Sequence, residues 1–81
     1  MNVLGAINKT DRGFEIIEFD DRYGVPCSLQ MSSMAEYEKP GTSAVWLGVN
    51  STRMHLDRQQ VTALVKHLKQ WLKHDTFERI T

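Results

Sequence analysis

The stretch Asp57–Lys73, DRQQVTALVKHLKQWLK, decides the fold that the sequence predicts. It opens with a residue that caps helices, because the Asp57 carboxylate can accept hydrogen bonds from the free backbone N–H groups of a first turn. Gln60 stands three positions later and completes the pattern of a capping box, while Leu56 and Val61 are spaced to form a hydrophobic staple. These signals predict one long C-terminal helix beginning at Asp57.

The apolar residues of this helix recur every three or four positions, which places them on one side at 3.6 residues per turn. We call this set the helix stripe; it consists of Val61, Leu64, Val65, Leu68, Trp71 and Leu72. The other side carries residues that favour solvent, namely Arg58, Thr62, Lys66, Lys69, Gln70 and Lys73. A helix with such a stripe needs an apolar surface to pack against.

Upstream of the helix the sequence predicts a small antiparallel sheet of three to four strands. The segments Phe14–Phe19, Val25–Met31, Ala44–Val49 and Arg53–Leu56 are short and rich in β-branched, aromatic or alternating apolar residues. The turn at 20–24 joins the first two as a hairpin, since aspartates and a glycine favour reversals. The predicted fold is α+β, with this sheet packed against the long helix in a single domain over residues 1–81.

Three further segments, at 1–12, 32–43 and 74–81, carry less regular signals than the predicted strands and helix. Met1–Arg12 has no clear period and is either a short strand around Val3–Ile7 or a loose arm. Ser32–Ser43 predicts a long loop, of a length that is often functional in compact domains. The strand Phe14–Phe19 has apolar residues on both sides, which indicates that one side meets another subunit. The tail His74–Thr81 either continues as a helical turn or docks on a neighbouring element.

Composition places the chain among small globular proteins. With 81 residues, 41% hydrophobic and 25% charged, it lies near the lower size limit for a core that folds alone, so a homo-oligomer is expected. The single cysteine, Cys27, excludes an intrachain disulfide and suits a reducing cytoplasm. No apolar run approaches the roughly 20 residues that span a membrane. We therefore expect a cytoplasmic protein.

The net charge is zero, which argues against a general DNA- or RNA-binding protein. The charge is nevertheless divided, because residues 1–49 hold seven acids and four bases while residues 50–81 hold six bases and three acids. Two interpretations stay open: the basic half is an exposed helix surface, or its arginines border a site for a small anion.

The sequence does not support an enzyme, a cofactor or a metal site. His55, His67 and His74 are spaced by twelve and seven residues, which matches no compact set of metal ligands. Asp20 and Asp21 read as turn residues, since no second acidic pair divides acid and base roles. Ser32 and Ser33 lack the glycines of a nucleophile elbow, and no glycine-rich phosphate loop is present.

What remains is a set of polar and planar residues at predicted strand ends and loops. Arginine supplies a forked donor for phosphate oxygens and a flat cation that stacks on a purine. Arg53 precedes the strand that leads into the helix N-terminus, where free N–H groups also favour anions. The alternative is that Arg22 pairs with a neighbouring aspartate and Arg53 is solvated. The candidate ligand-binding residues are Arg22, Tyr23, Gln30, Ser32, Ser33, Tyr37, Asn50, Arg53 and His55.

Four successive segments together carry a resemblance: DRYGVPCSLQ at 21–30, the Ser32-Ser33 pair, WLGV at 46–49 and RMHLDRQQV at 53–61. In this order they resemble a module of small phage and prophage proteins, the anti-Thoeris signal-sequestering family. Its members are sponge proteins that bind cyclic ADP-ribose isomers and, in some cases, cyclic oligonucleotides, and so withhold the signal of a bacterial antiviral defence. The similarity spans roughly residues 14–72.

The resemblance implies a sheet with a long helix, assembled as a dimer or higher oligomer with ligand pockets between subunits. Arg53 is then the residue most expected to touch the nucleotide, with Asn50 and His55 nearby and the loop 32–43 closing over the base. The connection 50–52 is short where some relatives are expected to carry insertions. Two other functions remain open: a protein-binding inhibitor or adaptor that acts on a host protein through the basic helix side, and a small nucleic-acid-binding module.

Overall fold

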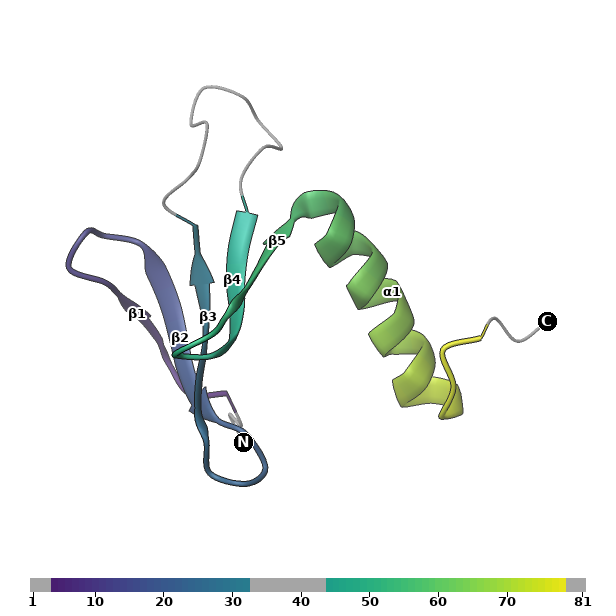
Figure 1. The fold of residues 1–81 in the computed structure, drawn as a ribbon. Helices are drawn as coiled ribbons and strands as arrows, with labels where there is room; N and C mark the ends of the chain where they lie inside the picture. Colours follow the sequence, from purple (N-terminus) through teal and green to yellow (C-terminus); the bar gives the residue numbers. More distant parts are fainter. Residues whose placement is uncertain (1–3, 33–43, 79–81) are drawn as a thin grey trace.

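The computed structural model describes residues 4–32 and 44–78, which form a five-stranded antiparallel sheet followed by one helix (Figure 1). Strands that follow one another in the chain also neighbour one another in the sheet, in the order β1-β2-β3-β4-β5. The predicted α+β class is confirmed, with five strands where three to four were predicted. The elements are β1 (Ile7–Lys9), β2 (Glu15–Asp20), β3 (Pro26–Met31), β4 (Ala44–Val49), β5 (Met54–Asp57) and α1 (Arg58–His74).

The fifth strand comes from the N-terminal region, for which the sequence left a strand and a loose arm open. β1 forms at Ile7–Lys9, later in the chain than the predicted strand around Val3–Ile7. It pairs with β2 through Ile7 opposite Ile17 and Lys9 opposite Glu15. A tight turn closes this hairpin, because the backbone N–H of Thr10 donates to the carbonyl of Phe14 over 2.8 Å.

The predicted turn between β2 and β3 is confirmed, and its aspartate acts through its side chain. Asp21 Oδ1 accepts hydrogen bonds from the backbone N–H groups of Tyr23, at 2.8 Å, and Val25, at 3.0 Å. Gly24 has a φ of 84°, a left-handed conformation that glycine adopts without steric cost. The turn fixes the register in which Phe19 lies opposite Cys27 and Ile17 opposite Leu29.

The strand register divides the sheet into two chemically different faces, because directly opposed residues share a face and successive residues alternate. One face is almost wholly apolar, and we call it the apolar sheet face; it carries Ile7, Ile17, Phe19, Cys27, Leu29, Met31, Val45, Leu47, Val49, Met54 and Leu56. The other face carries Ser28, Gln30, Trp46 and His55. Among the described residues, the buried apolar side chain is that of Cys27, which is 6% exposed.

Helix α1 follows β5 without a connecting residue, because Asp57 both ends β5 and caps the helix. The predicted capping box is present: Gln60 N donates to Asp57 Oδ1 over 2.8 Å, and Asp57 N donates to Gln60 Oε1 over 3.0 Å. The helix ends at His74, and the C-cap residue Asp75 has a left-handed backbone and donates its N–H to the Trp71 carbonyl over 2.8 Å. The N-terminal signals of the sequence therefore specify the start of α1 correctly.

Helix α1 stands away from the sheet, and its contact with the sheet is concentrated at β5 (Figure 1). None of its residues is buried, and the exposed fraction is 45% at Leu68, 47% at Trp71 and 75% at Leu72. The radius of gyration is 14.5 Å, against about 12 Å expected for a compact chain of this length. The predicted packing of helix on sheet is thus confined, within one chain, to the junction with β5.

Candidate ligand-binding site

The site is built around Arg53, which lies in the segment between β4 and β5. Its Nη1 donates to Gln30 Oε1 over 2.8 Å and to Ser28 Oγ over 3.2 Å, both on β3. These two partners are neutral, so they orient the guanidinium without neutralising it. The guanidinium has five N–H donors, and Nε and Nη2 hold three that remain suited to a phosphate or carboxylate oxygen.

Glycine at position 48 leaves room for the Arg53 side chain to pass over β4 and reach β3. Gly48 has a φ of 138°, a conformation that other residues rarely adopt, and an added Cβ would lie 3.5 Å from the Arg53 Cα. It stands opposite Ser28 in the register, so it leaves open the position through which Arg53 reaches β3. Ser28 is only 1% exposed at this point. The backbone that passes closest to Gly48 is therefore that of Arg53.

A planar pair lies beside the guanidinium. The rings of Trp46 and His55 are directly opposed on β4 and β5 and stack with centroids 3.9 Å apart and an angle of 10° between planes. The carbon centre of the Arg53 guanidinium is 5.7 Å from the Trp46 ring centroid, within the range of a cation–π contact. One cation and two aromatic planes thus share a face of the sheet.

The His55 ring of the stacked pair is held by a hydrogen bond with Ser32, whose Oγ lies 2.8 Å from His55 Nε2. Whichever atom carries the proton donates: Nε2–H to Oγ in one tautomer, the hydroxyl to Nε2 in the other. Ser32 is buried whereas the His55 side chain is exposed. We call the whole set the arginine patch; it consists of Ser28, Gln30, Ser32, Trp46, Arg53 and His55.

The arginine patch contains the groups that a nucleotide requires. A guanidinium with free N–H donors binds phosphate oxygens, and an exposed aromatic plane stacks on a base. The contacts within the patch fix Arg53, Trp46 and His55 before any ligand arrives, which lowers the entropy lost on binding. The patch therefore suits a small ligand that combines negative charge with a flat ring.

Of the nine predicted site residues, the structure brings four together in the patch: Gln30, Ser32, Arg53 and His55. The alternative that Arg53 is a solvated loop residue is wrong, because its guanidinium donates to Ser28 and Gln30. Its contact with a ligand stays a prediction. The prediction that His55 lies near Arg53 is also consistent with the stacked ring of Trp46, which contacts both.

The structure places three predicted residues outside the patch. Arg22 and Tyr23 lie in the β2–β3 turn, where the guanidinium is 5.5 Å from the Tyr23 ring centroid and Tyr23 is 82% exposed. Asn50 lies in the β4–β5 turn and donates its backbone N–H to the Pro26 carbonyl over 3.2 Å. Ser33 and Tyr37, with most of the predicted loop, lie outside the described residues.

Sequence reasoning missed two members of the patch, Ser28 and Trp46. Trp46 belongs to a continuous apolar run, which gave no reason to separate it from Val45 and Leu47. The signal that identifies both is alternation: Ser28 and Gln30 on β3, with Ser32 directly after the strand, stand at every second position and should share a face. The strand opposite them then supplies Trp46 to the same face.

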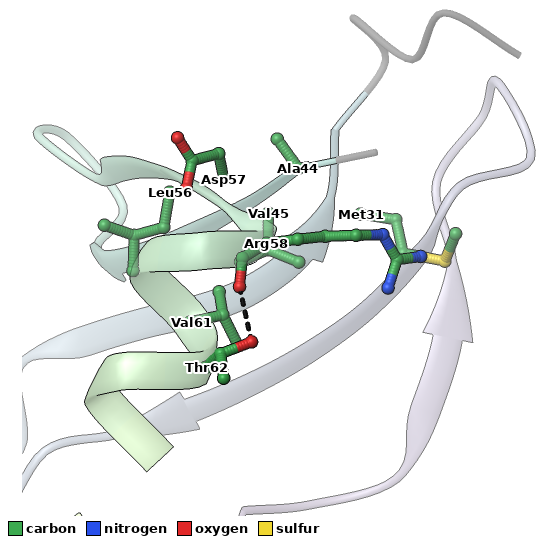
Figure 2. A pocket seen from close by; sticks show the side chains of 8 residues that line it. All are labelled: Met31, Ala44, Val45, Leu56, Asp57, Arg58, Val61 and Thr62. Atoms are coloured by element: carbon green, nitrogen blue, oxygen red, sulfur yellow. Dashed lines mark hydrogen bonds between the residues drawn. The ribbon is translucent and has the colours of Figure 1, made fainter. Parts of the chain in front are cut away.

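A separate pocket of about 250 Å³ opens where α1 leaves the sheet (Figure 2). Its lining is largely apolar and includes Met31, Val45 and Leu56 from the apolar sheet face, together with Ala44, Asp57, Arg58, Val61 and Thr62. It is smaller than the roughly 300–1,000 Å³ typical of small-molecule sites. The described residues that line it include no aromatic ring, whereas the arginine patch on the opposite face combines a cation with two rings, so we assign the candidate ligand site to the patch.

Comparisons with known proteins give no further assignment: no protein-family model, curated protein or solved structure matches this chain. In residues 4–32 and 44–78, no helix has both the length and the apolar composition needed to cross a membrane. Over the same residues, no cluster of three or more His, Cys, Asp or Glu side chains is arranged to hold a metal ion.

Proposed function

We propose that this protein binds and sequesters a cyclic nucleotide immune signal, a cyclic ADP-ribose isomer or a cyclic oligonucleotide, without changing it chemically. The observation that carries the proposal is the Arg53 guanidinium, held by Ser28 and Gln30 beside the stacked rings of Trp46 and His55. Such a ligand offers phosphate oxygens to the guanidinium and a base to the rings.

The resemblance of residues 14–72 to phage signal-sequestering proteins supports the same function. In this proposal a phage-type protein acts in the host cytoplasm, lowers the free signal and so blocks an antiviral defence. A binder of this kind has no need of a nucleophile or a general base. Its effect depends on affinity, which a fixed arginine and fixed rings raise by limiting the entropy lost on binding.

A calorimetric titration against cyclic ADP-ribose isomers and cyclic di- and trinucleotides tests the proposal. We expect saturable binding of at least one ligand, accompanied by a rise in melting temperature, because a ligand that binds only the folded state stabilises it by mass action. Arg53→Gln removes the charge from the patch, and Arg22→Gln makes the same change in the exposed β2–β3 turn. Absence of both heat and thermal shift across the ligands would remove the proposal.

A second candidate, a protein-binding inhibitor or adaptor, is favoured by the position of α1. The helix stands away from the sheet and exposes Lys66, Lys69 and Lys73, which a partner with an acidic surface can contact. Charge reversal at these three lysines should then abolish capture of a host protein while Arg53→Gln leaves it intact. The nucleotide-binding proposal predicts the opposite pattern, so a single set of variants separates the two.

A further inference from the structure

Two apolar surfaces lie uncovered in the described part of one chain. The first is the helix stripe, whose Leu68, Trp71 and Leu72 are exposed on α1. The second is the apolar sheet face, where Ile7 is 66% and Met54 is 53% exposed and most of the other side chains are only partly buried. A stable domain packs at least two layers of secondary structure around a core, and here the sheet and the helix do not supply both layers to each other.

The connection between β5 and α1 explains why the helix does not fold back over its own sheet. β5 ends at Asp57 and α1 begins at Arg58, and the capping box fixes the backbone at this junction. Connections between strands and helices that pack together commonly contain about 2–6 residues, which provide the reversal. With none available, α1 leaves the edge of the sheet and extends away from it (Figure 1).

The surface area indicates how much remains to be covered. The chain has an accessible surface of 6950 Å², whereas a compact monomer of 9.3 kDa is expected to have about 5,000 Å². The difference, roughly 2,000 Å² per chain, lies within the range that each subunit of an obligate dimer buries. It exceeds what a transient contact with a small partner requires.

Two helices paired only with each other would leave the apolar sheet face of each chain uncovered. A helix placed on the sheet of an identical chain covers the helix stripe and the apolar sheet face together.

We infer that a second copy of this chain covers both surfaces, with the helix stripe of each copy packed on the apolar sheet face of the other. In a two-fold symmetric dimer, the same contact occurs twice and covers the helix stripe and the apolar sheet face of both copies. The pocket at the N-terminal end of α1 lies where the helix stripe and the apolar sheet face meet, so it can receive an apolar side chain of the second copy (Figure 2). The arginine patch lies on the other face and stays open, so this assembly does not depend on the proposed ligand.

Cross-linking between single-cysteine variants tests this arrangement. In a Cys27→Ala background, one preparation carries Leu68→Cys in the helix stripe and another carries Ile17→Cys on the apolar sheet face. After mixing and exchange, a short bismaleimide should yield a cross-linked dimer of the two different chains. Ile16→Cys is the matched control, because it changes the same residue type one position away on the opposite face; it should yield little product.

Other outcomes would overturn the inference. Cross-linking of Leu68→Cys chains to each other, without the mixed product, would show that helices pair with helices. A monomer of 9.3 kDa by light scattering at concentrations of tens of micromolar would exclude the assembly altogether.

A substitution in the stripe provides an independent measurement. Leu68→Glu should raise the dissociation constant of the dimer by about thirtyfold or more, the effect of removing an anchor from the centre of an interface. Gln59→Glu adds the same charge on the opposite side of α1 and should leave the dissociation constant within about twofold. Sedimentation equilibrium measures both values, and equal effects of the two variants would contradict the docking of the stripe.

Discussion

The polar face of the sheet and the helix α1 differ in what one chain provides for them. On the polar face, Arg53 donates hydrogen bonds to Ser28 and Gln30, both on β3 of the same chain and 25 and 23 positions away in the sequence. On α1, the backbone is capped at both ends, yet the described residues of the same chain place no layer over most of the helix stripe. One region is organised within a chain, and the other, in the assembly that we infer, is completed between chains.

This difference separates the chemistry of binding from the assembly of the fold. Because the arginine patch is complete within a chain, substitutions there should alter ligand affinity before they alter the oligomeric state. Because the inferred assembly packs the helix stripe on a second copy, substitutions there should alter assembly and stability first. Variants of the arginine patch and variants of the helix stripe therefore test this difference independently.

The largest effect is expected from Arg53→Gln, which removes the charge of the patch. Hydrogen bonds to charged groups contribute about 1.5–3 kcal/mol, so the dissociation constant for the nucleotide should rise roughly 10- to 100-fold. Isothermal titration calorimetry measures the change. Arg22→Gln should bind as the native protein does, and an equal loss in both variants would place the site in the β2–β3 turn instead.

Gly48→Ala should destabilise the sheet by about 1–3 kcal/mol, because alanine is strained at a φ of 138°. The added Cβ would lie 3.5 Å from the Arg53 Cα, an ordinary contact distance, so ligand affinity should change less than stability. Urea unfolding monitored by Trp46 and Trp71 fluorescence gives the free energy. Ser51→Ala, in the exposed β4–β5 turn, should be nearly neutral, and neutrality at Gly48 would show that the backbone there is not constrained.

Asp57→Ala acts on the other region and removes the cap of α1. Loss of an N-cap carboxylate costs about 1 kcal/mol, and the melting temperature should fall accordingly without a direct effect on the arginine patch. Gln60→Ala removes only the return hydrogen bond to Asp57 N and should cost less. Circular dichroism at increasing temperature ranks the two, and the reverse order would contradict the observed capping box.

The smallest effect is expected from His55→Leu, which keeps an apolar side chain over Trp46 but removes the second ring and the contact with Ser32. Stacked aromatic pairs contribute about 0.5–1.5 kcal/mol beyond their buried area, so ligand affinity should fall roughly 2- to 13-fold. A fluorescence titration at Trp46 follows binding. An unchanged affinity would limit the base-stacking surface to Trp46 alone.

Local signals predicted the elements of this fold well. The capping box at Asp57 and Gln60 specified the helix start, and the side chain of Asp21 specified the β2–β3 turn, because both depend on residues within four positions of one another. β1 was only one of two open alternatives, since its three residues carry too little pattern to distinguish a strand from an irregular segment.

The contacts of the site depend on which residues of neighbouring strands lie opposite one another, and the sequence alone does not give this register. Arg53 and His55 could be predicted because both lie just before a recognisable helix. Trp46 could not, because only the pairing of β4 with β3 and β5 shows that it leaves the apolar face and joins Gln30 and His55. The separation of α1 from its own sheet follows from a connection of zero residues, whose consequence appears only in three dimensions.

The most direct test of the proposed function follows the fate of the ligand. The protein is incubated with a cyclic ADP-ribose isomer or cyclic oligonucleotide, and the free ligand is measured by chromatography after ultrafiltration and again after heat denaturation. Sequestration predicts that the free concentration falls in proportion to the protein, that the intact ligand returns on denaturation, and that Arg53→Gln depletes much less. A cleaved ligand, or a free concentration that the protein does not change for any ligand tested, would contradict sequestration.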